Sequence, residues 1–201
     1  IPKKRLRTHP NLYGLARIRN YVVQTSDKNV VVQVDDDLQC VYCWPGWKRR
    51  VITDPPALER IILGTAQLAV DAGISMFCWG NRGRPLYFRD NNPFSFTESA
   101  SWALGTVGKS VRWDERLITM VDTDATLQQL KSNRIILSDT RYYWACGSIF
   151  QNRGGMQSIR TLEAVKADEE LMQGKWGTCT PRDKGKSSTK ANSIHVRRKQ
   201  L

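Results

Sequence analysis

The chain has 201 residues, with 31 Lys and Arg against 19 Asp and Glu and a formal net charge of +12 at pH 7. This length allows one domain with an apolar core that needs neither disulfides nor metal. No stretch approaches the roughly 18–20 apolar residues of a membrane span, so we expect no membrane contact. Five scattered cysteines do not resemble a disulfide scaffold, and we expect a reducing intracellular compartment or a virion.

The positive charge is concentrated at the two ends of the chain. Residues 1–20 contain six basic and no acidic residues, and residues 175–201 contain eight basic residues and one acid. Subtracting both ends from the total leaves about −1 for the middle. Basic arms are attracted to a polyanion, whereas a near-neutral body has another task. We therefore predict a basic N-terminal arm (1–19), a globular body (20–174) and a basic C-terminal tail (175–201).

The first part of the body predicts a hairpin. Residues 11–19 allow a short helix within the arm. Two β-rich runs, 21–23 and 30–34, are separated by the polar stretch 25–29, which predicts two paired strands and a turn. A third strand is expected at 38–44.

The clearest helix is predicted at 56–72. Its apolar residues recur at intervals of three and four, Asp54 is a good N-cap, and Gly73 follows its end. A buried strand is expected at 74–79 and a short strand at 86–88.

The remaining segments alternate between the two types of element. We expect helices at 98–112, 124–132 (capped by Asp122 or Asp124) and 157–172, and strands at 117–121, 135–137 and 142–150. The last helix is predicted to bury Ile159, Leu162, Val165 and Leu171. Together these elements predict an α+β fold: a mixed body of antiparallel β-hairpins and about four helices, flanked by basic extended arms.

The basic arms are the first candidate binding site. Each Lys or Arg that neutralises a phosphate releases counterions, which favours binding to nucleic acid without reading its sequence. Arms that are merely solvated, or that act as localisation signals, are the alternative. The candidate phosphate contacts are Lys3, Lys4, Arg5, Arg7, Arg17, Arg19, Arg182, Lys184, Lys186, Lys190, Arg197, Arg198 and Lys199.

A second candidate site combines aromatic and basic residues within the body. Trp47 stands beside Lys48, Arg49 and Arg50, and this pairing of a stacking face with cations suits single-stranded nucleic acid. Arg82 and Arg84 repeat the pattern in a loop after Trp79. The alternative is that these tryptophans pack in the core.

Two sequence patterns are candidates for metal sites. Cys40 and Cys43 form half of a zinc site, but residues three apart on a strand face opposite ways, so we expect no metal there. Asp35, Asp36 and Asp37, with Asp54, could hold Mg²⁺ for phosphodiester cleavage. A metal-dependent nuclease is therefore the alternative function.

Two further patterns argue against other enzymes. Residues 103–110 satisfy a relaxed phosphate-loop pattern ending in Lys109 and Ser110, but the expected elements around it do not fit a nucleotide site. The histidines, His9 and His195, lie in the arms. A body without histidine leaves no imidazole for Ser-His-Asp or Cys-His catalysis.

The sequence therefore favours a structural nucleic-acid-binding protein of a large assembly, with RNA favoured as the partner. A viral coat or nucleocapsid protein and a ribonucleoprotein component are its two versions. The expected protein partners are the subunits of that assembly, possibly further copies of this chain. We expect no catalytic activity and no cofactor. A DNA-binding regulator would require a helix-turn-helix or finger signature, which the sequence does not contain.

Overall fold

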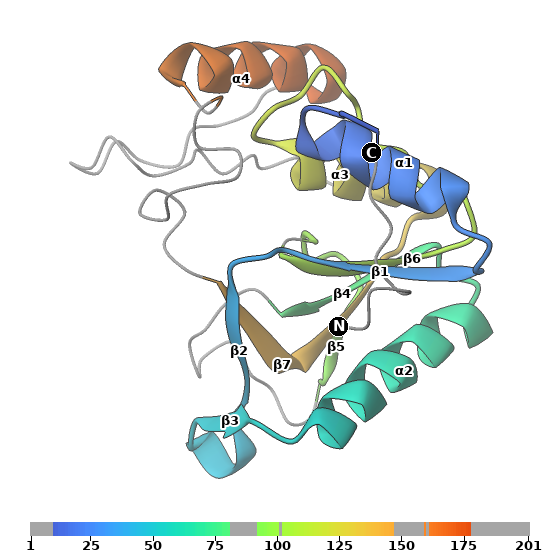
Figure 1. Ribbon diagram of the computed structural model, residues 1–201, viewed down its shortest axis with the longest axis vertical. Helices are drawn as coiled ribbons and strands as arrows, with labels where there is room; N and C mark the ends of the chain where they lie inside the picture. Colours follow the sequence, from blue (N-terminus) through green and yellow to red (C-terminus); the bar gives the residue numbers. More distant parts are fainter. Residues whose placement is uncertain (1–9, 81–91, 101, 147–158, 160, 178–201) are drawn as a thin grey trace.

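The computed structural model describes residues 10–80, 92–100, 102–146, 159 and 161–177. Its elements follow the chain as shown in Figure 1. They are α1 (Leu15–Thr25), β1 (Val30–Val34), β2 (Leu38–Cys43), the 3-10 helix η2 (Pro45–Trp47), β3 (Arg50–Ile52), α2 (Pro55–Asp71), β4 (Met76–Gly80), β5 (Phe94–Ser95), β6 (Ala103–Val107), α3 (Val121–Asn133), β7 (Leu137–Cys146) and α4 (Leu162–Trp176). The predicted α+β class, with four α-helices in this part of the chain, is confirmed.

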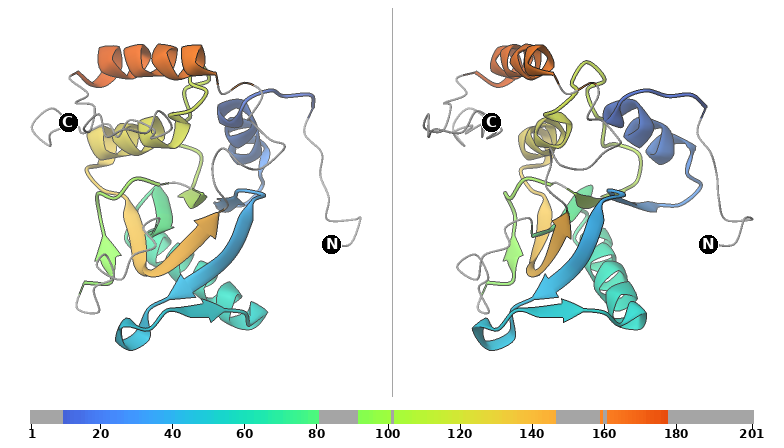
Figure 2. Two further views of the ribbon diagram at one scale, coloured as in Figure 1. Left: turned by 90° about the vertical axis from the view of Figure 1, so that its left-hand side faces the viewer. Right: turned by 60° about the vertical axis from the view of Figure 1, so that its left-hand side comes forward.

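Seven strands form one mixed sheet. Their order is β1-β6-β4-β7-β2-β3, and β5 pairs separately with β7. Neighbouring strands are antiparallel except β4 and β7, which are parallel. Helices α1, α3 and α4 lie on one side of the sheet and α2 lies on the other (Figures 1 and 2).

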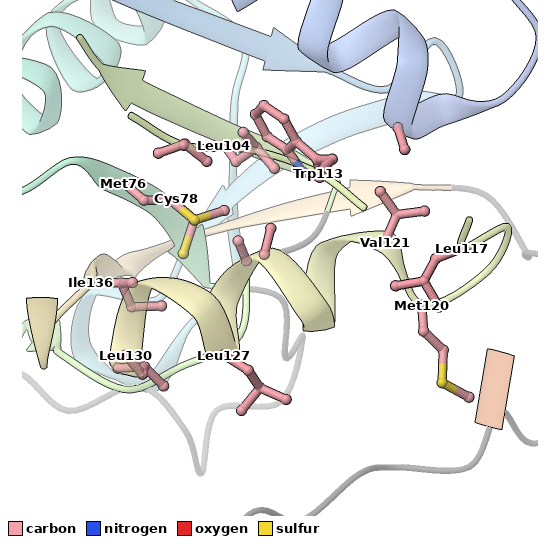
Figure 3. Close-up of a cluster of buried hydrophobic side chains, with 14 of the residues drawn as sticks. Met76, Cys78, Leu104, Trp113, Leu117, Met120, Val121, Leu127, Leu130 and Ile136 are labelled. Atoms are coloured by element: carbon pink, nitrogen blue, oxygen red, sulfur yellow. The ribbon is translucent and has the colours of Figure 1, made fainter. Parts of the chain in front are cut away.

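The central strand β4 shows how the two sides form separate cores. All five of its residues are buried. Met76 and Cys78 belong to the apolar cluster under α1, α3 and α4, which Figure 3 shows in close-up. Phe77 and Trp79 belong to the cluster against α2. Alternate side chains of a strand face opposite ways, so a continuous apolar run such as this one is typical of a strand covered on both faces.

Helix α2 forms as its local sequence predicts. The Asp54 carboxylate accepts a hydrogen bond from the Ala57 amide at 3.1 Å, and Pro55 occupies the first helical position. A cap of this kind satisfies an amide that the helix itself leaves without a partner. In the cluster against α2, the Phe77 ring fits over Gly105 of β6, where an added Cβ would lie 2.0 Å from the ring.

Helix α1 is fixed to the sheet by a buried arginine. The Arg19 side chain is only 2% exposed and forms ion pairs with Asp35, just after β1, and with Asp122 in the first turn of α3. Burial lowers the pKa of Arg19 while Asp35 raises it. A buried cation needs such partners, since an unpaired charge in the interior is very costly.

A buried carboxylate fixes α4 in the same way. Asp168 is 2% exposed and accepts hydrogen bonds from the backbone amides of Ile118 and Thr119 and, at 3.2 Å, of Met120. The Thr119 hydroxyl donates to the same carboxylate at 2.7 Å. Asp168 thereby joins α4 to the segment that enters α3.

The predicted hairpin of 21–23 and 30–34 is wrong. Residues 21–23 lie inside α1, and β1 pairs with β6 instead. Ala16, Arg19 and Val23 are the buried residues of α1, and their spacing of three and four is the helical one. The β-branched Val22 and Val23 favour a strand locally, but they continue the helix in which Arg19 is buried.

Four later expectations also need correction. The predicted helix 98–112 contains strand β6, so the phosphate-loop pattern of 103–110 lies largely on a strand. Residues 117–120 of the predicted strand 117–121 are irregular, and Val121 is already the first residue of α3. Helix α3 has Met120 at its N-cap position, and neither Asp122 nor Asp124 caps it. The predicted strands 135–137 and 142–150 are not separate: Leu137 and residues 142–146 belong to one strand, β7, and residues 147–150 lie outside the described part.

Helix α4 confirms a helix near 157–172, although its inward face differs from the prediction. Its buried residues are Asp168, Met172 and Trp176, whereas Leu162 is 70% exposed. The predicted boundaries 19/20 and 174/175 fall inside α1 and α4, so both helices belong to the body. The predicted strand 86–88 and most of both arms lie outside the described residues. In the part that the structure describes, no helix is long and apolar enough to span a membrane.

Candidate nucleic-acid interface

Aromatic residues cross the sheet at one level of the strand register. Tyr42 on β2 lies opposite Tyr143 on β7, and Tyr143 lies opposite Gly80 on β4. Continuing the β4–β6 register by two residues brings Trp102, just before β6, opposite Gly80. Residues at one level of neighbouring strands share a face of the sheet. We call Trp102, Tyr143 and Tyr42 the aromatic row.

The rings of the aromatic row are in contact. Tyr42 and Tyr143 are stacked, with ring centroids 6.0 Å apart and an angle of 11° between the planes. Trp102 meets Tyr143 edge-to-face at 6.3 Å. Both are favourable arrangements for aromatic pairs. Trp102 reaches Tyr143 across an intervening strand because Gly80 has no side chain between them. A Cβ on Gly80 would also lie 3.1 Å from the Tyr142 carbonyl oxygen.

No described residue of β2 or β7 joins the apolar cluster under α1, α3 and α4. The strand members of that cluster come from β1, β4 and β6. In Figures 1 and 2, the β2–β3 end of the sheet is the end farthest from α4. Trp102, Tyr143 and Tyr42 are each half-buried, and the neighbouring Val51 of β3 is 48% exposed. The row is therefore a surface with accessible ring area.

Basic residues lie at the β3 end of this row. The Arg49 guanidinium lies 4.9 Å from the centroid of the Tyr42 ring, and Lys48, Arg49 and Arg50 are all exposed. Arg50 pairs with Cys43 and therefore faces the α2 side, opposite to the row. Of the three predicted cations, the structure places Arg49 directly against the row. The Trp47 side chain lies outside the described part.

The environment keeps the row uncharged and hydrogen-bonding. A hydrogen bond with Cys40, on the same face of β2, raises the pKa of Tyr42, and burial raises that of Tyr143. Both phenols are neutral at physiological pH, since their ordinary value is near 10. Burial and the nearby Asp37 carboxylate raise the pKa of Cys146, at the end of β7. The row thus has a basic end at Arg49 and an acidic turn beyond Cys146.

The predicted contacts of the first arm divide into two groups. Arg17 is exposed on α1, with an ion pair to Glu115 at 3.5 Å, and stays a candidate phosphate contact. The prediction for Arg19 is wrong, because its guanidinium is buried in ion pairs with Asp35 and Asp122. The candidates outside the described residues are Lys3, Lys4, Arg5, Arg7, Arg82, Arg84, Arg182, Lys184, Lys186, Lys190, Arg197, Arg198 and Lys199.

The candidate metal ligands are separated or occupied. The side chains of Cys40 and Cys43 lie on opposite faces of β2, and the four described cysteines are free. Asp35 pairs with Arg19, and Asp54 caps α2. Across residues 10–80, 92–100, 102–146 and 161–177, no three His, Cys, Asp or Glu side chains are grouped so as to hold a metal ion.

Sequence reasoning missed the aromatic row. Tyr42 and Tyr143 lie in segments that we predicted as strands, and each is flanked by a residue facing the other side. That alternation was a usable signal for a surface aromatic. The contact between the two rings could not be predicted from the sequence, because it depends on pairing residues that are about a hundred positions apart.

Comparisons with known proteins contribute no assignment. No family model, curated protein sequence or solved structure matches this chain.

Proposed function

We propose that this protein is a structural, single-stranded RNA-binding component of a large assembly. Bases stack on Trp102, Tyr143 and Tyr42, and Arg49 with Lys48 contacts the phosphates beside them. The basic termini add sequence-independent contacts to the RNA backbone.

The observation that carries the proposal is the aromatic row with Arg49 at one end. Half-buried rings in register across a sheet offer their accessible area as successive platforms for unpaired bases, since every base has a flat face. A guanidinium beside such a platform adds both charge and stacking. The net charge of +12 supplies the long-range attraction.

The two versions of the proposal differ in self-association. A coat or nucleocapsid protein assembles into large particles when RNA is added, whereas a ribonucleoprotein component stays monomeric without its cognate RNA. Sedimentation velocity of the full chain, with and without a single-stranded RNA, distinguishes the two.

The binding test is a titration of a fluorescent single-stranded RNA with the full chain at several salt concentrations. Replacing Tyr42 and Tyr143 with Ala removes two platforms. Stacking on an aromatic side chain contributes about 1–3 kcal/mol per base, so we expect about a tenfold loss of affinity or more. The slope of affinity against salt should remain, because no phosphate contact is removed.

Two control variants isolate the row. Tyr13→Ala removes an aromatic side chain that is 82% exposed and lies outside the row. Arg60→Ala removes an exposed cation from α2, on the other side of the sheet. Both should bind RNA nearly as the natural chain does. Equal losses in the controls and in the double tyrosine variant, with all variants folded, would refute base stacking on the row.

A further inference from the structure

A second surface feature lies away from the aromatic row. A cleft of about 400 Å³ opens between the second half of α3, the end of α4 and the segment that joins β6 to α3. Three of its charged lining residues are basic and one is acidic. The lining residues are Arg112, Trp113, Asp114, Gln128, Lys131, Lys175 and Trp176.

The acid that lines the cleft is already neutralised. The Asp114 carboxylate accepts two hydrogen bonds from the Arg116 guanidinium, at 2.9 and 2.6 Å, and one from Lys175 Nζ at 2.9 Å. These contacts hold the pKa of Asp114 well below its usual range. Asp114 therefore has little capacity left to attract another cation.

A second acid, Asp124, contacts three lining residues and is neutralised as well. Asp124 is fully buried on α3 and is 2.6 Å from Lys175 Nζ. It also accepts hydrogen bonds from Gln128 at 2.7 Å and from the Trp176 indole at 2.9 Å. Lys175 is thus shared by both acids and belongs to the framework of the cleft.

The two remaining cations have no acidic partner among the described residues. Arg112 and Lys131 are both exposed and line the cleft. Lys131 Nζ lies 5.7 Å from the centroid of the Trp176 ring, which positions it without neutralising it. The charge left over in the cleft is therefore positive.

The backbone that carries Arg112 is held in place before any ligand arrives. Asn20 of α1 donates to the Trp113 carbonyl and accepts from the Trp113 amide, each at 2.9 Å. Nearby, the Lys109 side chain donates a hydrogen bond to the Gln24 backbone carbonyl, and the Gln24 side chain donates one to the Lys109 backbone carbonyl. A preorganised site loses less conformational entropy on binding.

We propose that this cleft binds a phosphate group between Arg112 and Lys131. A guanidinium offers paired donors matched to phosphate oxygens, and an ammonium adds a compact charge. The phosphate comes either from a free polyphosphate or from the backbone of the bound RNA. The RNA source alone rests on the function proposed above.

The probe is inorganic pyrophosphate, titrated calorimetrically into the full chain. The test variant carries Arg112→Gln and Lys131→Gln. The matched control carries Arg60→Gln and Lys166→Gln, which removes the same charge from exposed positions outside the cleft. Thermal melts confirm that both are folded. We expect at least about a tenfold loss of pyrophosphate affinity in the test variant and less than about twofold in the control.

A second arm repeats the single-stranded RNA titration with both variants. A loss of RNA affinity beyond that of the control identifies the RNA backbone as the source, whether or not pyrophosphate binds. Unchanged RNA affinity with loss of pyrophosphate binding identifies a free polyphosphate. Equal pyrophosphate affinities and equal RNA affinities in the test and control variants would refute the proposed phosphate site. The Tyr42→Ala, Tyr143→Ala variant should bind pyrophosphate normally. The proposed phosphate site and the proposed base stacking are therefore tested independently.

Discussion

The two halves of the sheet differ in whether helices cover one face or both. Strands β1, β6 and β4 are covered by helices on both faces, and their side chains in the cluster under α1, α3 and α4 (Val31, Met76, Cys78 and Leu104) include no aromatic ring. Strands β7, β2 and β3 share the α2-side core but have no described side chain in the cluster under the three other helices. The aromatic row occupies that uncovered face. Large rings here contribute little to packing against helices, so their presence calls for another explanation, and base stacking supplies one.

Removing an ion pair should lower the free energy of unfolding more in the covered half than in the uncovered half. Arg19→Met keeps much of the side-chain volume but leaves Asp35 and Asp122 without their shared cation. Breaking a buried ion pair by removing one partner costs about 3–5 kcal/mol. Chemical denaturation should show that loss in the free energy of unfolding. The exposed Arg17→Met is the control, and a cost for Arg19→Met no greater than for Arg17→Met would contradict the buried role.

The same substitution at two glycines, one inside the covered half and one at its border with the uncovered half, tests the comparison. In the covered half, Gly105→Ala places a Cβ 2.0 Å from the ring of Phe77, a side chain that is fully buried. We expect a cost of about 3 kcal/mol from overpacking. At the border of the uncovered half, where the end of β4 meets β7, Gly80→Ala meets the Tyr142 carbonyl oxygen at 3.1 Å and needs only a small shift.

The same pair of variants separates stability from binding. We expect Gly80→Ala to cost about 1 kcal/mol in the free energy of unfolding and to weaken RNA binding by disturbing the contact between Trp102 and Tyr143. Thermal melts and the RNA titration measure the two effects. Equal stability losses at Gly80 and Gly105 would mean that the border with the uncovered half is packed as tightly as the inside of the covered half.

The segment between β6 and α3, which contains Asp114, should lose stability in acid. The pKa of Asp114 is lowered in the fold, chiefly by its hydrogen bonds with Arg116 and then with Lys175. A lowered carboxyl pKa contributes stability above the unfolded value of about 4, and this is lost as the pH falls below it. Asp114→Asn should therefore lower the melting temperature at pH 7.

The difference between the natural chain and Asp114→Asn should narrow as the pH falls from about 4 to about 2. Glu59→Gln, on the exposed side of α2, should cause no such pH-dependent difference. A gap that stays constant down to pH 2 would show that the Asp114 charge is not what stabilises this segment.

The smallest effect on stability is expected in the uncovered half. Arg49→Ala removes an exposed cation that lies over the Tyr42 ring, so melting should change little. The salt dependence of RNA binding should weaken by about one phosphate contact. An unchanged salt slope would place the phosphates elsewhere.

The sequence alone determined those elements whose signals are local. Asp54, Pro55 and a long apolar stripe predict α2 within a few residues, and the apolar run 74–79 predicts β4. In both cases cap, period and burial agree within one segment. The concentration of charge at the two ends was equally readable, because it needs no partner to be recognised.

Only the tertiary structure decided the rest. Val22 and Val23 join a helix because Arg19, one turn away, finds Asp35 and Asp122 in the interior. Residues 103–107 form a strand because β1 and β4 flank them. The aromatic row and the cationic cleft both depend on pairs far apart in the chain, such as Tyr42 with Tyr143 and Lys175 with Asp114. Strand register and buried ion pairs are set by non-local packing, and no local pattern of residues encodes which partner a side chain will meet.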